Sequence, residues 1–307
     1  MRWTVLFWVP TKQIAAALDS LPGVAVEVVA PDGSPLPPGA ADVEFYVPPF
    51  FPAMAAITAI GQLPSLRVVQ AQTAGVERLL PQVPPGVTLC NARGVHDAST
   101  AEWVVAVTLA ALRDLPYFAA EQAAQRWSYR FTDSLADKSV LIVGYGSIGG
   151  AVERRLSGFE VEIRRVARRP RDGVSAISEL PELLPHADVV ILLAPVTPET
   201  IGMVDAPFLA RMKDGALLVN AARGSLVVTG ALTEELQRGR LRAAVDVTDP
   251  EPLPPGHPWW GLPNVLITPH VAASTTAQMG RMLTFLRAQA DRFITGEDLV
   301  NVVAGPY

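Results

Sequence analysis

The sequence predicts an α/β protein made of two Rossmann-like or flavodoxin-like domains, each with a parallel sheet. Short apolar runs alternate with helix-like segments along the whole chain, which is typical of βα units. Two series of such runs are separated by a long, almost wholly apolar helical stretch that starts near residue 98. With 307 residues, the chain is long enough for two ordinary domains.

The expected strands fall into these two series. In the first we expect strands over 4–9, 24–29, 43–47, 67–70 and 87–90. In the second we expect six strands, over 139–143, 161–166, 188–193, 216–220, 243–247 and 265–268. A final helix is expected over 275–293.

The helix between the two series is predicted over 98–112, with a continuation past Pro116 to Trp127 as an open alternative. Ser99 and Thr100 are candidate caps, because Glu102 stands three residues beyond Ser99, as in a capping box.

Composition excludes several classes of protein. Half of the residues are hydrophobic and 18% are charged, so the chain can bury a full core. A net charge of −5 argues against general nucleic-acid binding. Cys90 is the only cysteine, which rules out an intramolecular disulfide and Cys-rich zinc sites, and no metal-ligand spacing occurs. No signal peptide or apolar run of membrane-spanning length is seen, so we expect a cytoplasmic protein with no membrane, metal or nucleic-acid partner.

A glycine-rich turn follows the first strand of the second series. Gly144, Gly146 and Gly149 come directly after the apolar run VLIV and precede a helical segment. Strand, glycines and helix in this order form the context of a dinucleotide-binding turn. Gly144 permits the tight turn, Gly146 lets a pyrophosphate approach the backbone, and Gly149 lets helix and strand pack closely. The helix amides and dipole then favour the phosphates.

Three later segments each bring polar side chains to the end of an expected strand. Arg223 follows the strand ending at Asn220, Asp246 and Glu251 follow the next, and His270 follows the third. Ligands of an open parallel sheet bind at this edge, where the glycine turn also lies. Arg223 can hold a carboxylate by paired hydrogen bonds, and His270 can exchange a proton with the substrate oxygen. Glu251 can orient His270 and favour its charged form.

With these residues the chain resembles the D-2-hydroxyacid dehydrogenase family, which includes glyoxylate/hydroxypyruvate reductases and phosphoglycerate, formate and phosphite dehydrogenases. The motifs that carry the resemblance are VGYGSIGG, LLAPVTPET, NAARGS, DVTDPEP and ITPHVAAST, in this order. The resemblance covers nearly the whole chain. It implies a substrate domain of residues 1–94 plus 277–307, into which a dinucleotide-binding domain of residues 95–276 is inserted. It also implies a homodimer built through the cofactor domain by the helix near 98–127.

The resemblance implies site residues as well. Arg223, Glu251 and His270 would be the catalytic residues, and Asp246 would lie near the nicotinamide carboxamide. The segment AQTAGV would contact the substrate carboxylate together with Arg223 and His270, and its contributing residues are Thr73, Ala74 and Gly75. The implied cofactor-binding positions are Gly144, Gly146, Ser147, Ile148, Gly149, Arg168, Arg169, Pro195, Thr200, Ala221, Ala222, Arg223, Asp246 and His270. The chain departs from the family at Val228, where Asp is common, and in a shorter stretch before DVTDPEP.

The arginines of VEIRRVARRPRDG indicate which nicotinamide cofactor binds. NAD binding usually involves an acidic residue about 20 residues past the glycines, whereas 163–171 contains none. Arg168 and Arg169 stand at that place, and a guanidinium suits a 2′-phosphate. The sequence therefore predicts NADP(H) as the preferred cofactor, with NAD(H) as the alternative. Arg164 and Arg165 are interpreted as strand decoration, and the nearby charges of residues 153–155 as a solvated helix face.

The function predicted from these features is NADP(H)-preferring hydride transfer between small 2-oxo acids, such as glyoxylate or hydroxypyruvate, and D-2-hydroxy acids. One alternative is oxidation of phosphite or formate on the same fold. Another is a non-catalytic, corepressor-like protein that senses dinucleotides. Trp103 and Trp127 are interpreted as core or dimer-contact residues.

Overall fold

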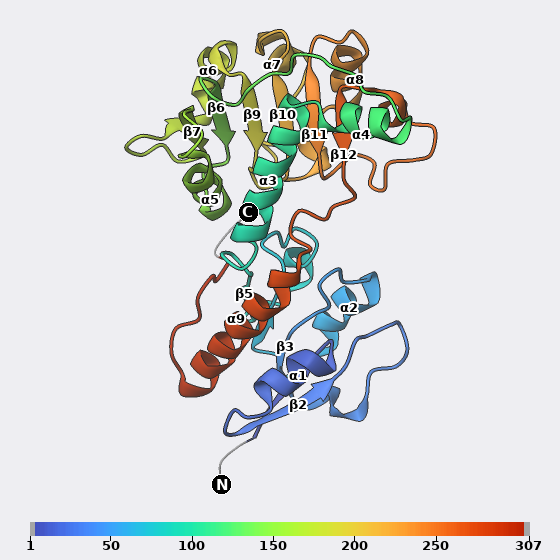
Figure 1. The fold of residues 1–307 in the computed structure, drawn as a ribbon. Helices are drawn as coiled ribbons and strands as arrows, with labels where there is room; N and C mark the ends of the chain where they lie inside the picture. The colour runs from blue at the N-terminus through green and yellow to red at the C-terminus, as the bar shows by residue number, and fades with distance from the viewer. Residues whose placement is uncertain (1–3, 304–307) are drawn as a thin grey trace. The chain divides into compact units, whose positions relative to one another are not determined.

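The computed structural model describes residues 4–303 and divides the chain into two compact units. Unit 1 comprises Met1–His96 with Thr276–Tyr307, and unit 2 is the intervening segment Asp97–Thr275 (Figure 1). Each unit contains its own parallel sheet, so the predicted class of two parallel-sheet α/β domains, one inserted in the other, is confirmed. The outermost residues of the expected substrate domain, 1–3 and 304–307, lie outside the described part of the chain.

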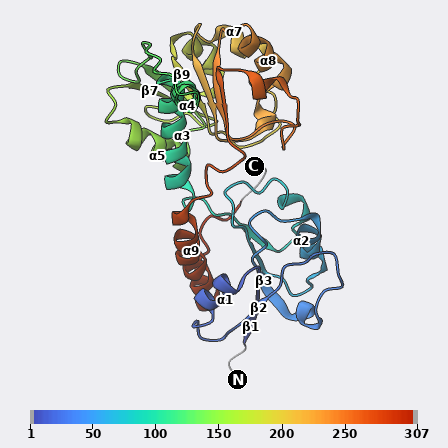
Figure 2. The ribbon, with the colours of Figure 1, turned by 45° about the vertical axis from the view of Figure 1, so that its right-hand side comes forward.

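Unit 1 has a five-stranded sheet in the order β2-β1-β3-β4-β5. Its strands and α-helices are β1 (Val5–Val9), α1 (Lys12–Leu18), β2 (Val24–Val28), β3 (Val43–Tyr46), α2 (Met54–Thr58), β4 (Val68–Gln70), β5 (Thr88–Cys90) and α9 (Thr276–Thr295). Successive side chains of β1 enter opposite layers, as the period of a strand requires. Phe7 packs against α1 and α9, which lie side by side in Figure 2, whereas Trp8 packs on the α2 side.

Unit 2 has a seven-stranded sheet in the order β12-β11-β10-β9-β6-β7-β8. Its strands are β6 (Ser139–Val143), β7 (Glu162–Ala167), β8 (Ser175–Ala176), β9 (Val189–Leu192), β10 (Leu217–Asn220), β11 (Arg242–Val245) and β12 (Val265–Ile267). Its α-helices are α3 (Asp97–Leu112), α4 (Leu115–Ala123), α5 (Ser147–Leu156), α6 (Leu180–Leu183), α7 (Ala206–Arg211) and α8 (Thr229–Gln237). The expected six strands are all present. The seventh, β8, was missed because two residues carry no apolar pattern.

The layers of unit 2 follow from the buried residues. Val140 and Ile142 of β6 face α3 and α5, while Leu141 and Val143 face the layer of α6, α7 and α8. The chain runs outward from β6 through β7 to β8, then returns to β9 on the other side of β6. The carboxyl end of β6 is therefore the switch point at which such sheets bind ligands.

The helix after unit 1 ends at Leu112, as predicted, but it begins one residue earlier and does not continue past Pro116. It begins at Asp97, so Ser99 and Thr100 lie inside it, and both are buried. Ser99 is not a cap, because its Oγ lies 2.7 Å from the Thr275 Oγ1. The chain turns at Asp114, whose φ is 49°, and α4 is a separate helix bent by 66° from α3. Pro116 lies in the first turn of α4, where proline is tolerated, whereas inside a continuous helix it would break a hydrogen bond.

No single helix within residues 4–303 is long and apolar enough to cross a membrane. The bent pair α3 and α4 reaches that length and apolar content only when the two helices are counted together.

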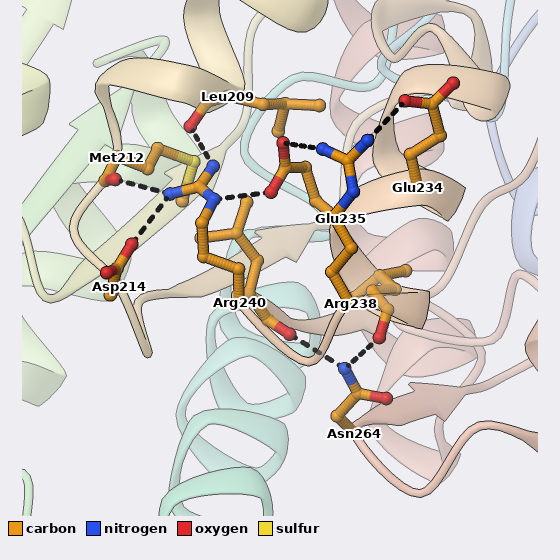
Figure 3. A network of polar contacts seen from close by, with 10 residues as sticks. Leu209, Met212, Asp214, Glu234, Glu235, Arg238, Arg240 and Asn264 are labelled. Atoms are coloured by element: carbon orange, nitrogen blue, oxygen red, sulfur yellow. Dashed lines mark hydrogen bonds and ion pairs between the residues drawn. The ribbon is translucent and has the colours of Figure 1, made fainter.

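The amino ends of β11 and β12 are fixed by a polar network around Arg240 (Figure 3). Arg240 donates to the carbonyls of Leu209 and Met212 at 2.6 and 2.9 Å and pairs with Glu235. Asn264 donates to two carbonyls beside it at 2.9 and 2.8 Å. This network lies at the opposite sheet edge from the glycine turn, so it anchors strands without entering the candidate site.

Candidate active site

The glycine turn begins where the fully buried strand β6 ends. Gly144 has a φ of +100°, and a Cβ there would lie 2.3 Å from the backbone nitrogen of Ala194. No side chain fits at that distance, so only glycine lets the turn pass beside the loop that follows β9. A Cβ on Gly149 would lie 3.1 Å from the Gly144 carbonyl oxygen, which explains the close packing of α5 on the turn. These are the roles that the sequence predicts for both glycines.

Gly146 behaves differently, and its surroundings fit a dinucleotide pyrophosphate. It is exposed, and a Cβ built on it meets no atom within 4 Å. It stands at the N-cap of α5, with Ser147 and Ile148 as the first helical residues. The amides of a helix N-terminus and its positive dipole end bind phosphate, and a glycine keeps the approach open. The residues present therefore suit the cofactor that the turn predicts.

The loop after β9 lies beside the glycine turn and contains two predicted cofactor positions. Thr200 is buried, and its hydroxyl donates to the Pro195 carbonyl at 2.7 Å. The same oxygen accepts from the Thr197 backbone amide at 2.8 Å. Pro195 and Thr200 thus belong to one compact turn.

Arg223 is carried by a loop that the buried Asn220 organises at the end of β10. The Asn220 amide group accepts from Ala222 N at 3.0 Å and donates to the Arg223 carbonyl at 3.0 Å. The Ala221 amide donates to the carbonyl of Leu192, the last residue of β9, at 3.3 Å. A Cβ on Gly224 would lie 2.0 Å from the Thr248 carbonyl oxygen, so this loop packs directly on the backbone that follows β11.

His270 and Glu251 meet as the sequence predicts. The His270 Nδ1 lies 2.7 Å from the Glu251 Oε1, and the side chains are 33% and 42% exposed, respectively. Glu251 is therefore placed to orient the imidazole at a site that solvent can reach. His270 has a φ of 54°, a left-handed conformation that is uncommon for a residue other than glycine.

The backbone that carries Glu251 is held by two threonines that sequence reasoning missed. The Thr248 hydroxyl donates to the Pro250 carbonyl at 2.8 Å, and the Thr229 hydroxyl donates to the Asp249 carbonyl at 2.7 Å. Thr248 lies within the motif DVTDPEP, but the motif does not reveal this contact. No motif marks Thr229, whose contact joins positions 20 residues apart.

Asp246 is buried and accepts hydrogen bonds from three donors of the His270 loop. Its Oδ1 accepts from the Thr268 hydroxyl at 2.6 Å and from Val271 N at 2.9 Å. Its Oδ2 accepts from Ala272 N at 2.8 Å. The carboxylate thus links the end of β11 to the loop after β12. This structural role was not part of the prediction, which placed Asp246 near the nicotinamide.

The arginine cluster divides into two groups, one within β7 and one after it. Arg165 pairs with Glu153 of α5, with Nε to Oε2 at 2.9 Å, and Glu153 also accepts from the Tyr145 hydroxyl. The hydrogen bond from Arg165 lowers the pKa of Glu153, whereas the one to Glu153 raises the pKa of Tyr145. The interpretation of Glu153 as part of a solvated face, and of Arg165 as decoration, is therefore wrong. Both are tied to the glycine turn by contacts between distant residues.

The second group is exposed at the end of β7. Arg168 and Arg169 are exposed, and within the described residues neither side chain makes a hydrogen bond or ion pair. Glu199 lies within electrostatic reach of Arg168, and its pKa is lowered mainly by a hydrogen bond from Thr197, with Arg168 contributing. Arg171 donates to the Tyr145 carbonyl at 2.8 Å and so braces the glycine turn, a contact the sequence did not reveal.

Thr73, Ala74 and Gly75 form a tightly held loop in unit 1. The Thr73 hydroxyl donates to the Gly75 carbonyl at 2.6 Å, and its carbonyl accepts from Ala92 N at 2.9 Å. Asn91 donates to the Ala74 carbonyl at 3.0 Å. The loop after β4 is thereby braced by the loop after β5. Its proposed contact with a substrate carboxylate stays a prediction.

The comparison with known proteins agrees with this geometry. The family model for the NAD binding domain of D-isomer specific 2-hydroxyacid dehydrogenases matches residues 105–272. A glyoxylate reductase/hydroxypyruvate reductase of Mus musculus is 33% identical over 225 residues, which cover 69% of each chain. The chain spans 42% and 48% of the length of the D-3-phosphoglycerate dehydrogenases of Archaeoglobus fulgidus and Mycobacterium bovis, to which it is 34% identical.

Two similar solved structures contain the phosphorylated cofactor. A D-isomer specific 2-hydroxyacid dehydrogenase from Xanthobacter autotrophicus, in complex with NADPH and MES, has a TM-score of 0.84 and 27% identity, with 98% of each chain covered. An NADPH-dependent glyoxylate/hydroxypyruvate reductase from Sinorhizobium meliloti, in complex with NADP and malonate, has a TM-score of 0.81 and 26% identity. That alignment covers 98% of this chain and 97% of the other.

The family match covers more than half of the chain and includes the glycine turn, Arg223, Glu251 and His270. The matched domain binds a nicotinamide dinucleotide, as the open approach at Gly146 also indicates. The protein therefore belongs to the D-isomer specific 2-hydroxyacid dehydrogenase family of oxidoreductases.

Proposed function

We propose that this protein is a cytoplasmic, NADP(H)-preferring reductase that interconverts small 2-oxo acids, such as glyoxylate or hydroxypyruvate, with D-2-hydroxy acids. The observation that carries the proposal is the hydrogen bond of 2.7 Å between His270 and Glu251, on the same sheet edge as the dinucleotide turn. A carboxylate-supported imidazole there serves proton exchange with a substrate oxygen.

Each side chain of the site would then have one task. The nicotinamide, when bound, supplies or accepts the hydride at C2 of the substrate. With Nδ1 directed to Glu251, His270 would exchange the proton of the substrate oxygen at Nε2. Arg223 would hold the substrate carboxylate by a charge-assisted pair and polarise the adjacent carbonyl. Thr73, Ala74 and Gly75 would contact the same carboxylate through their backbone.

The preference for NADP(H) rests on Arg168 and Arg169. Both are exposed at the end of β7, without the acidic residue that usually binds an unphosphorylated ribose. Similar enzymes of known structure bind NADPH or NADP, which supports the proposal. Glu199, close to Arg168, is the observation that favours NAD(H) as the alternative, because a carboxylate repels a 2′-phosphate.

The arginine proposal predicts a selective effect on one cofactor. Replacing Arg168 and Arg169 together with glutamine should raise the KM for NADPH by roughly tenfold or more, since each charge-assisted contact contributes about 1.5–3 kcal/mol. The KM for NADH should change little. Steady-state kinetics with both cofactors provide the measurement. Arg164→Gln is the matched control, because Arg164 pairs with Glu162 instead. Equal changes with the two cofactors would refute the proposal.

The reaction itself is tested by a panel of substrates. Purified protein should oxidise NADPH with glyoxylate, hydroxypyruvate or related 2-oxo acids. Reduction of NADP⁺ by phosphite or formate alone would favour the alternative dehydrogenase activities. Absence of turnover with the whole panel, together with retained NADPH binding, would favour a dinucleotide-sensing binding protein.

We also propose that the protein is a homodimer through unit 2. In the segment after α4, side chains alternate between contact with the protein and exposure to solvent. The Ser128 hydroxyl shares a hydrogen bond of 2.5 Å with the Tyr117 hydroxyl, while the aromatic side chains on either side of Ser128 are exposed. These neighbours form the aromatic strip, which consists of Trp127, Tyr129 and Phe131, 102%, 79% and 90% exposed. Exposed apolar patches of this kind mark association surfaces.

The dimer is checked by sedimentation. Wild-type protein should sediment as a dimer at micromolar concentration, and replacing Trp127 and Phe131 with serine should weaken association. A wild type that is monomeric under these conditions would rule the dimer out.

A further inference from the structure

A chain of side-chain hydrogen bonds runs from helix α3 to the loop that carries His270. The indole Nε1 of Trp103 donates to the Thr268 Oγ1 at 3.0 Å. The Thr268 hydroxyl in turn donates to the Asp246 Oδ1 at 2.6 Å. A threonine hydroxyl has one hydrogen to give, so the indole N–H can only be its donor and the carboxylate its acceptor. The direction of the chain is therefore fixed.

Asp246, the last residue of this hydrogen-bonded chain, also holds the backbone of His270 and of the two residues after it. Its carboxylate accepts from the amides of Val271 and Ala272, directly after His270. Its backbone carbonyl accepts from the His270 amide at 2.7 Å. His270 keeps its left-handed φ of 54° within this frame, because neighbouring groups determine such conformations at functional sites.

We propose that Trp103 is a positioning residue for His270 and acts through Thr268 and Asp246. The catalytic part of this inference rests on the proposed reductase function. Trp103 suits the task because it lies on a 16-residue helix whose neighbouring side chains pack in a buried layer against the sheet. It therefore gives a fixed starting point to the chain of hydrogen bonds that ends at the His270 loop.

The indole N–H has a specific consequence for the hydroxyl it reaches. With the donor present, the Thr268 oxygen is occupied by an N–H, and its own hydrogen points to Asp246. Without the donor, the hydroxyl can rotate, and Asp246 loses an oriented partner in a buried site. The His270 loop then has more freedom than proton exchange at a fixed substrate oxygen tolerates.

Trp103 also packs with the apolar side chains beside α3, so a purely structural role is the competing explanation. Trp103→Phe separates the two, because phenylalanine keeps an aromatic ring in the layer but has no N–H. Trp259→Phe is the matched control. The Trp259 Nε1 donates to the Thr233 Oγ1 at 2.9 Å, so the same kind of bond is lost away from the His270 loop.

The kinetic test uses the intact protein with NADPH and its best 2-oxo acid. Trp103→Phe should lower kcat by about tenfold to a hundredfold, as a misplaced catalytic group does, with the KM for NADPH unchanged. Trp259→Phe should leave both constants at the wild-type level. An equal loss of kcat in the two variants, or no loss in Trp103→Phe, would overturn the proposal.

Thr268 supplies a second, isosteric test. Thr268→Val keeps the shape and removes the hydroxyl, so it should lower kcat like Trp103→Phe, whereas Thr268→Ser should retain most of the activity. Because both residues belong to one chain of bonds, the double variant Trp103→Phe/Thr268→Val should be little worse than Thr268→Val alone. Fully additive losses would contradict the proposed chain.

Hydrogen exchange provides a readout that does not need turnover. The amides of Val271 and Ala272 should exchange faster in Trp103→Phe than in wild type, and Trp259→Phe should not change them. Inactive wild-type protein that shows this difference would refute the reductase function and leave the positioning intact. Active wild type with unchanged exchange and kcat in Trp103→Phe would refute the positioning alone.

Discussion

Replacing His270 with alanine is expected to lower kcat for 2-oxo acid reduction by roughly a hundredfold to ten-thousandfold, the usual contribution of a positioned general acid. NADPH binding should stay largely intact, because His270 is only one of many implied cofactor positions and the glycine turn, α5 and the arginines after β7 are unchanged. Steady-state kinetics together with NADPH fluorescence titration measure both quantities. Full activity in the variant would remove His270 from the reaction.

Two controls make this result specific. Glu251→Gln keeps the shape beside the imidazole but removes the charge, so its kcat should fall less than that of His270→Ala. His186→Ala removes an exposed histidine at the amino side of β9 and should have no effect. If Glu251→Gln were as active as wild type, the carboxylate would have no part in supporting His270.

Gly224→Ala is expected to have the second large effect, although the change adds only one methyl group. The new Cβ would lie 2.0 Å from the Thr248 carbonyl oxygen and 2.1 Å from its carbon, and both are backbone atoms that cannot rotate away. The loop bearing Arg223 and the backbone leading to Glu251 must then move apart. A shift of about 1 Å in a site can cost about a hundredfold in rate, and overpacking costs about 1–3 kcal/mol of stability.

The control for this prediction lies nearby in sequence. A Cβ on Gly230, in the first turn of α8, meets no atom within 4 Å. Gly230→Ala should therefore keep full activity and stabilise the helix by about 0.5–1 kcal/mol. Thermal unfolding and kcat/KM, measured on the two variants side by side, give the comparison. A Gly224→Ala protein with wild-type kcat/KM would show that the two loops do not need this close approach.

The fold was predictable where local sequence decides it. The strand 139–143 was predicted with the observed ends, because its apolar run is followed at once by Gly144, and the turn at that position requires a glycine. The cap at Ser99 was wrong, because the hydroxyl bonds to Thr275, 176 residues away. The break before α4 was available in the sequence, since Pro116 fits the start of a new helix better than the interior of an old one.

The candidate site divides in the same way. Arg223, Glu251 and His270 were named because polar residues after successive parallel strands must lie at one edge of the sheet. The supports of the site could not be named. The bond from Trp103 to Thr268 spans 165 residues, and the clash that reserves Gly224 depends on a backbone 24 positions further along the chain. Such contacts follow from the completed packing of unit 2 and carry no local signature.

The hydrogen bond between Ser99 and Thr275 also has a consequence for how this architecture can be rearranged. It closes unit 2 near its first and last residues, so the points where the chain enters and leaves that unit lie next to each other. A segment with adjacent ends can be exchanged between host proteins without stretching either host, as circular permutation and domain insertion require. Residues 97–275 thus have the geometry of a cassette, and we expect this nucleotide-binding segment to be transplantable independently of the residues that precede and follow it in the sequence.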